Sequence, residues 1–178
     1  MNEPHLRLFL ALPCPLPVAE TLSAWCAAHC PGGRPLHPAD LHVTLAFLGN
    51  QPADQVARVT EAVAGLPLPA FRLELGTPHR WRDLLVLLPE RAPAALTAFQ
   101  SRLRERLEQA GLPVERRPYR PHLTLARRVS EAPPAATAPQ VAWQVREWGL
   151  YRSVEGQPRY QRLAGWPAVS AGNSSPTS

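Results

Sequence analysis

Two short segments in different halves of the chain carry the same polar pattern and could together perform acid–base chemistry. Residues 41–46 are LHVTLA and residues 121–126 are PHLTLA, so a threonine follows each histidine by two positions. Side chains alternate between the two faces of a β-strand. Each segment, as a strand, therefore places its histidine and threonine on one face and an apolar pair on the other. The apolar pair predicts a core face. The polar pair predicts a face toward water, a cleft or a ligand, because burying an unpartnered polar group is costly.

If the two strands face each other across a cleft, the imidazoles of His42 and His122 converge. Imidazole has an ordinary pKa of about 6.5, so near neutral pH one ring can be free and the other protonated. The hydroxyls of Thr44 and Thr124 can donate to phosphate oxygens, and arginines can balance the charge of the transition state. These residue types suit in-line phosphoryl transfer without a metal, with one histidine as base and the other as acid.

Composition and charge favour a globular protein with an anionic ligand. The chain has 178 residues, of which 45% are hydrophobic, enough for one domain or for two small lobes sharing a core. The net charge is +5 and every basic residue is an arginine, which codon bias in a GC-rich genome also explains. Five of the 19 arginines nevertheless lie within residues 116–128, around His122. Guanidinium groups bind phosphate bidentately, so this cluster favours a ligand such as RNA.

Several other classes of protein are not supported. The chain has no apolar run of 18 residues, as a membrane span would need. The apolar stretch within its first 17 residues is too short for a signal peptide, and this segment is too rich in proline. We therefore expect a cytoplasmic protein. Three cysteines are too few for a disulfide framework. Cys26, His29 and Cys30 offer an alternative metal site, but no matching second set of ligands follows, so we expect no metal and no cofactor.

Hydrophobic periodicity predicts an α+β fold with antiparallel sheets, because hairpins outnumber crossovers. The repeated His-x-Thr strand suggests two similar halves. Residues 70–76 and 83–89 are expected to form an antiparallel hairpin around a longer loop. Helices are expected at residues 15–30, 52–65 and 93–111 and strands at residues 5–12, 41–49, 70–76, 83–89, 122–127, 140–153 and 159–167, with a surface loop at 130–139 and a disordered polar tail at 170–178.

Taken in order, four segments resemble the 2H phosphoesterase superfamily, and within it the RNA 2′,3′-cyclic phosphodiesterases, also called the 2′–5′ RNA ligase family. The segments are RLFLAL (7–12), LHVTLAFLG (41–49), YRPHLTLAR (119–127) and LYRSVEGQPRYQRL (150–163). The resemblance implies a single bilobal catalytic domain over residues 1–169. In it, two antiparallel sheets face each other across a central cleft, each sheet carries one motif, and the helices lie outside. It also implies metal-independent, cofactor-free hydrolysis of RNA 2′,3′-cyclic phosphate ends to 2′-phosphates, with reversible 2′–5′ ligation of tRNA halves.

The resemblance also implies roles for individual residues. His122 would be the base that activates water and His42 the acid that protonates O3′, while Thr44 and Thr124 would bind the phosphate. Phe47 corresponds to a base-stacking aromatic and Arg127 to a phosphate-binding arginine, and Arg120 is a further candidate for the RNA backbone. Strict alternation places Phe47 and Arg127 on the wrong face, so they reach the site only if the strand twists, bulges or ends. The alternatives are a core position for Phe47 and a solvated charge for Arg127.

Two other functions remain open on the sequence. One is a cyclic phosphodiesterase for a small nucleotide, and the other is an RNA-binding module without catalysis. Trp81 lies in a polar segment and is a candidate for stacking on a nucleotide, while Tyr160 lies in a matching segment without an assigned role. We expect a monomer with RNA as its partner, no membrane association and no obligate protein partner.

Overall fold

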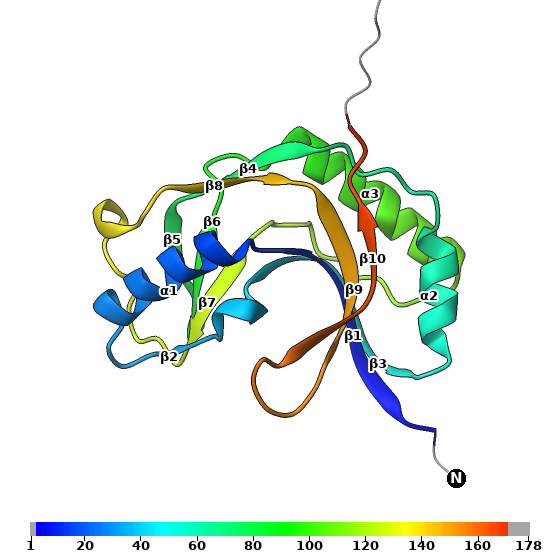
Figure 1. Cartoon of the computed structure of the whole chain (residues 1–178), viewed down its shortest axis with the longest axis horizontal. Helices are drawn as coiled ribbons and strands as arrows, with labels where there is room; N and C mark the ends of the chain where they lie inside the picture. Colours follow the sequence, from blue (N-terminus) through cyan, green and yellow to red (C-terminus); the bar gives the residue numbers. More distant parts are fainter. Residues whose placement is uncertain (1–2, 171–178) are drawn as a thin grey trace, which may run out of the picture.

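One long antiparallel sheet organises the structure (Figure 1). The computed structural model describes residues 3–170, and the predicted polar tail lies outside them from residue 171 onward. In this sheet the strands follow the order β10-β9-β1-β3-β7-β6-β5, with β2 beside β7, while β4 and β8 form a separate pair. The strands are β1 (His5–Pro13), β2 (Arg34–Pro35), β3 (His42–Pro52), β4 (Phe71–Leu75), β5 (Thr77–Trp81), β6 (Leu84–Leu88), β7 (Leu123–Arg127), β8 (Val141–Val145), β9 (Glu147–Ser153) and β10 (Tyr160–Pro167).

The α+β class with antiparallel sheets is confirmed, but the strands are distributed differently from the expectation. Both His-x-Thr motifs belong to the same hydrogen-bonded sheet instead of one on each of two sheets. That sheet has two arms, β10-β9-β1-β3 and β7-β6-β5, and the pairing of β3 with β7 is a single residue pair, Val43 with Leu123. Periodicity shows which face of a strand is apolar but not which strand is its neighbour, so the sequence did not reveal this junction.

Three α-helices cover the described part of the sheet from outside. Figure 1 shows α1 at one end of the molecule and α2 and α3 at the other. Helix α1 contacts β7, and α3 contacts β3. Each of these helices therefore packs against the arm opposite to the one that contains the strand before it. The helices are α1 (Leu16–His29), α2 (Gln55–Val63) and α3 (Ala94–Gln109).

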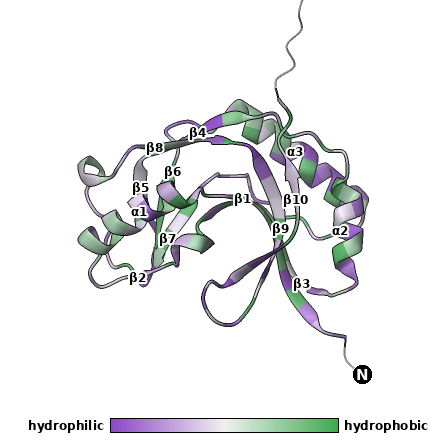
Figure 2. Cartoon of the chain, in the orientation of Figure 1, coloured by the Kyte–Doolittle hydropathy of each residue, from purple (hydrophilic) through white to green (hydrophobic). Residues whose placement is uncertain are grey.

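Helix α3 illustrates how sequence pattern produces packing. Its apolar residues recur at helical spacing and are fully buried: Leu96, Phe99, Leu103 and Leu107. Proline precedes the helix, and Gly111 follows it with a φ of +72°, a conformation that favours glycine. Figure 2 shows hydrophobic and hydrophilic residues interspersed along α2 and α3, as expected of helices that cover a core with one face. No helix in residues 3–170 is long and apolar enough to cross a membrane.

The predicted hairpin between residues 70–76 and 83–89 was wrong. Residues 77–81, expected as a loop, form β5, and β5 pairs with β6 through a tight turn at Arg82 and Asp83. Strand β4 pairs instead with β8, so that its three buried residues face the buried residues of β8. The predicted strand 140–153 is likewise two strands, because β8 lies in the small sheet and β9 in the large one.

Candidate active site

The junction between β3 and β7 brings the two motifs together. Val43 and Leu123 are fully buried and point toward the core. Residues next to them in sequence must point to the opposite face, and residues paired across an antiparallel ladder share a face. The antiparallel direction places each histidine beside the threonine of the other motif, in an approximate two-fold relation about the Val43–Leu123 pair. The residues on this face are His42, Thr44, His122 and Thr124.

Backbone carbonyls orient both imidazoles in the same way. His42 Nδ1 lies 2.7 Å from the carbonyl oxygen of Asp40, and His122 Nδ1 lies 2.8 Å from that of Arg120. A carbonyl oxygen can only accept, so each Nδ1 carries hydrogen and donates it. Each Nε2 is therefore the nitrogen that can exchange a proton with a substrate.

His42 is the more enclosed of the two histidines. Its ring centroid lies 4.9 Å from that of Phe9 and 5.2 Å from that of Tyr160, which meets it edge-on. Desolvation lowers the pKa of His42, the Asp40 carbonyl and charge partly oppose this, and nearby His122 lowers the pKa further. The neutral ring can accept a hydrogen bond at Nε2 from the Thr44 hydroxyl, at 3.1 Å.

Asp40 is a buried carboxylate that holds the His42 side of the site together, and the sequence reasoning missed it. Its side chain is 5% exposed, and its oxygens accept from the backbone N–H of Arg159 at 2.9 and 3.0 Å and of Tyr160 at 3.0 Å. These bonds tie the start of β10 to the residue whose carbonyl orients His42. The position of Asp40 in the sequence was one indication of this role. An aspartate two residues before a motif histidine has to be hydrogen-bonded if it is buried.

His122 lies beside a tryptophan and an arginine. The ring centroids of His122 and Trp81 are 4.6 Å apart, and the Arg120 guanidinium carbon lies 4.7 Å from the centroid of the Trp81 ring. Arg120 thus contributes its carbonyl to His122 and its side chain to Trp81. This contact brings Trp81 to the candidate site, and Tyr160 reaches it beside His42.

A bulge in β3 brings Phe47 to the site face. Thr44 and Ala46 pair with consecutive residues of β1, so Leu45 is an extra residue that resets the alternation. Phe47 consequently lies on the same face as Thr44. It is 42% exposed, which removes the alternative of a core position, and the Arg7 guanidinium carbon lies 4.9 Å from its ring centroid.

Strand β7 has a bulge at the corresponding position. Thr124 and Ala126 pair with consecutive residues of β6, which makes Leu125 the extra residue. Arg127 therefore lies on the same face as Thr124, at the position equivalent to Phe47. Arg127 is exposed, and its strand neighbour is Arg34 of β2.

A cavity of about 650 Å³ adjoins the His122 side of the site. The predicted site residues Thr44, Phe47, Arg120 and His122 line it, together with Trp81. His42 lies instead in a depression of about 20 Å³, and Thr44 joins the two spaces because its hydroxyl bonds to His42. Thr124 and Arg127 line neither space. The structure thus groups most of the predicted site residues, with these two at the margin.

None of the three cysteines lines the cavity or the depression beside the two histidines. Cys14, Cys26 and Cys30 are free thiols, and burial raises the pKa of Cys14 to about 12 and that of Cys26 to about 11. His29 Nδ1 bonds to the carbonyl of Trp25. Among residues 3–170, no group of three or more His, Cys, Asp or Glu side chains is arranged to hold a metal ion.

Comparison with known proteins places this geometry in a family. The model of the 2′-5′ RNA ligase superfamily matches residues 14–157. An RNA 2′,3′-cyclic phosphodiesterase of Escherichia coli is 36% identical over 177 residues, covering 93% of this chain and 98% of the relative. Another, from Thermus thermophilus, is 31% identical over 143 residues, covering 68% of each chain.

Solved structures agree. The crystal structure of E. coli LigT complexed with 3′-AMP matches with a TM-score of 0.80 and 30% identity, covering 93% of this chain and 99% of the other. The crystal structure of TT0787 from T. thermophilus matches with a TM-score of 0.76 and 26% identity, covering 93% and 100%. The family expected from the paired motifs is confirmed: this chain belongs to the 2′-5′ RNA ligase superfamily.

Proposed function

We propose that this protein hydrolyses the 2′,3′-cyclic phosphate at RNA ends to a 2′-phosphate, using His42 and His122 as an acid–base pair. One observation carries the proposal: both imidazoles meet at one junction, and each has its Nδ1 committed to a carbonyl, which leaves Nε2 for proton exchange. Nε2 of His42 accepts from the Thr44 hydroxyl at 3.1 Å in the free protein, and the substrate replaces this bond when Thr44 turns to the phosphate. Binding alone needs no such pair, whereas in-line displacement needs a proton acceptor on one side of phosphorus and a donor on the other. The curated relatives described above carry the name of this activity.

The proposed reaction takes the roles of the two histidines from the family resemblance. Nε2 of His122 takes a proton from water as the water oxygen bonds to phosphorus, and the bond from phosphorus to O3′ breaks. O3′ takes a proton from Nε2 of His42, which leaves a 2′-phosphate and a 3′-hydroxyl. The hydroxyls of Thr44 and Thr124 donate to the non-bridging oxygens. The same displacement with an RNA 5′-hydroxyl in place of water gives a 2′–5′ linkage, so we extend the proposal to reversible ligation, including that of tRNA halves.

The acid role of His42 makes a demand on the substrate. Burial lowers its pKa in the free protein, which favours the neutral ring. An anionic cyclic phosphate beside the ring favours the charged form and opposes the effect of burial. Substrate binding therefore has to bring or retain the proton that O3′ later accepts. The division of roles itself follows the family resemblance.

Three flanking residues complete the proposed site. Phe47 stacks on the terminal base with its exposed face, and Arg120 and Arg127 contact phosphates of the RNA. We also propose that residues 1–169 form one catalytic domain. The protein is then a cytoplasmic monomer without an obligate protein partner.

The direct test uses an RNA oligonucleotide ending in a 2′,3′-cyclic phosphate, with a strong metal chelator present. We expect the wild type to form a 2′-phosphate, and His42→Ala and His122→Ala each to lower the rate by roughly 10²- to 10⁴-fold. His79→Ala is the matched control, because His79 is exposed on β5 and contributes to neither cavity.

The other outcomes separate the alternatives. A 3′-phosphate product would reverse the assignment of the leaving oxygen. Full activity in either histidine variant would remove the acid–base pair from the mechanism. RNA binding with no turnover would favour a binding module, and turnover confined to cyclic mononucleotides would favour a small-nucleotide enzyme.

A further inference from the structure

The cavity beside His122 extends well past the catalytic face, as far as helix α3 and residues 114–119. Its volume of about 650 Å³ lies in the range of pockets that enclose a whole small ligand, about 300–1,000 Å³. A phosphate group alone occupies a small part of such a space. The remainder is available to the body of the terminal nucleotide and to what precedes it.

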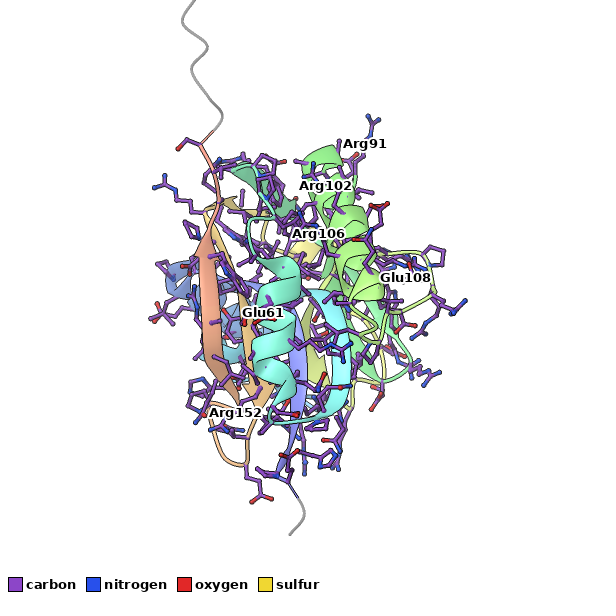
Figure 3. All side chains as sticks on the ribbon, turned by 90° about the vertical axis from the view of Figure 1, so that its right-hand side faces the viewer. Glu61, Arg91, Arg102, Arg106, Glu108 and Arg152 are labelled. Carbon is purple, nitrogen blue, oxygen red and sulfur yellow. The ribbon has the colours of Figure 1, made fainter. Side chains whose placement is uncertain are left out.

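Arg104 is the α3 residue that gives this extension its charge. Arg102 donates to the carbonyl of Pro67, and Arg106 donates to those of Ala62 and Ala64. These two arginines, both labelled in Figure 3, therefore attach α3 to the end of α2 and the segment that follows it.

Arg104 differs from its two neighbours in both place and partners. It is half-buried and lines the cavity. Within residues 3–170, the salt bridges and side-chain hydrogen bonds do not include its guanidinium. A guanidinium that lines a cavity and has no partner among these contacts keeps its N–H donors free for an anionic ligand.

The cavity also contains a second cation, Arg120, that can bind the same anionic ligand as Arg104. Arg120 comes from the segment before β7, and its guanidinium lies over Trp81 with N–H groups to spare. Arg117 also lines the cavity, but it is paired with Glu115 at 2.7 Å, so its charge is already balanced. The uncompensated positive charge of this space therefore comes from Arg104 and Arg120.

We propose that Arg104, assisted by Arg120, binds the phosphate attached to O5′ of the nucleotide that carries the cyclic phosphate. This inference rests on the proposed function. A terminal nucleotide with its cyclic phosphate at His122 and its base on Phe47 has one other anionic group, the phosphate on its 5′ side. His122, Phe47 and Arg104 line the same cavity, and its volume is in the range that holds a whole small ligand.

This subsite gives the enzyme a way to recognise a chain end. A guanidinium fork matches the geometry of two phosphate oxygens, and such charge-assisted bonds are stronger than neutral ones. A free cyclic mononucleotide with a 5′-hydroxyl lacks the group that Arg104 binds. An RNA end always presents it, because the phosphate at O5′ is the link to the rest of the chain.

The test compares two substrates that differ only in this phosphate: adenosine 2′,3′-cyclic phosphate and its 5′-phosphorylated form. We expect wild-type kcat/KM to be roughly tenfold higher for the 5′-phosphorylated substrate. Arg104→Ala should remove most of this preference, and Arg104→Lys should retain part of it, since lysine keeps the charge but loses the fork. Arg102→Ala is the matched control: it removes the same charge from the same helix, and we expect it to keep the wild-type ratio.

Each result is decisive for one of the two proposals. Equal kcat/KM for both substrates in the wild type, or an unchanged preference in Arg104→Ala, would overturn the subsite while hydrolysis itself stands. An equal loss of preference in Arg102→Ala would replace the subsite with general charge attraction. If the wild type hydrolyses neither mononucleotide but hydrolyses the oligonucleotide with a cyclic end, the proposed function stands; if it hydrolyses none of the three, the proposed function fails. The subsite is then judged by calorimetry, where it predicts tighter binding of adenosine 2′,5′-bisphosphate than of adenosine 2′-phosphate, with the difference lost in Arg104→Ala.

Discussion

At the scale of single residues, the two catalytic candidates have the same backbone contact and different surroundings. Carbonyls two residues upstream fix both imidazoles, but His42 is enclosed by Phe9 and Tyr160 whereas His122 borders the large cavity beside Trp81. The enclosure lowers the pKa of His42. The enclosure therefore opposes the proposed acid role of His42, and the anionic substrate has to offset it.

The lowered pKa of His42 predicts a pH-dependent contribution to stability. The folded protein binds a proton at His42 less readily than the unfolded chain, whose ordinary value is 6.5. Its contribution is present above that pH and is lost as the pH falls toward the folded pKa. We expect the free energy of unfolding in urea to decrease from about pH 7.5 to about pH 5.5 less steeply in His42→Asn than in the wild type. An identical slope in the two proteins would show that His42 does not titrate abnormally.

Phe47 and its neighbour Leu48 should separate substrate binding from core packing. Phe47→Ala removes an exposed ring, so we expect stability within about 0.5 kcal/mol of wild type and a loss in kcat/KM on RNA corresponding to about 1–3 kcal/mol of stacking. Leu48 is 2% exposed, and Leu48→Ala should lower the free energy of unfolding by about 2–5 kcal/mol. Urea unfolding and steady-state kinetics check both variants. A Phe47→Ala protein with wild-type kinetics would refute the stacking role.

At the scale of elements, the sequence predicted the faces of the strands better than their partners. The helices appeared where apolar residues recur at helical spacing, and the His-x-Thr strands present their polar residues together because alternation is local. The pairing of β4 with β8 depends on residues about 70 positions apart, and periodicity carries no information about such contacts. The bulges at Leu45 and Leu125 likewise arise from pairing with β1 and β6, so strict alternation misplaced Phe47 and Arg127.

The same distinction explains which site residues could be predicted. The histidines and threonines were found because their types and repetition indicate chemistry. Asp40 and Tyr160 belong to the site through contacts between β10 and the segment before β3, which are distant in sequence. Trp81 was found only as a candidate, because its contact with His122 requires the β5–β6 hairpin that the sequence reasoning placed differently.

The hydrogen bonds that Asp40 accepts from the start of β10 should matter to both folding and activity. Asp40→Ala leaves the backbone N–H groups of Arg159 and Tyr160 without their acceptor, so we expect a loss of about 1–3 kcal/mol in the free energy of unfolding. Tyr160 should then pack less closely against His42, and kcat should fall as well. Asp54→Ala is the control, because Asp54 is exposed and bonds only to its neighbour Gln55 among the described residues.

The comparison of the two aspartates decides this prediction. Urea denaturation should show Asp54→Ala within about 0.5 kcal/mol of wild type. Equal stability of Asp40→Ala and Asp54→Ala would mean that water replaces the Asp40 carboxylate without cost. The hydrogen bonds between Asp40 and β10 would then contribute nothing to stability.

At the scale of the whole molecule, the positive charge should favour long anionic substrates. The net charge is +5, and the arginines around the cavity come from α3 and from the segment before β7. Binding that neutralises phosphates releases counterions, and the logarithm of affinity falls with the logarithm of salt by about 0.7 per phosphate on a single strand. We expect kcat/KM to fall more steeply with salt for an oligonucleotide with a cyclic end than for a cyclic mononucleotide. Parallel slopes would limit RNA recognition to the terminal nucleotide.

The two-fold relation about Val43 and Leu123 has a consequence for regiochemistry. A substrate turned end for end would meet the same arrangement of imidazoles and hydroxyls with the two histidines exchanged. The symmetric backbone alone therefore does not select which ester bond of the cyclic phosphate opens. The selection has to come from what differs around the two motifs: the enclosure of His42, the cavity beside His122, and the flanking positions, where one strand carries Phe47 and the other Arg127. We therefore expect the residues that bind the two ends of the nucleotide to decide which product forms.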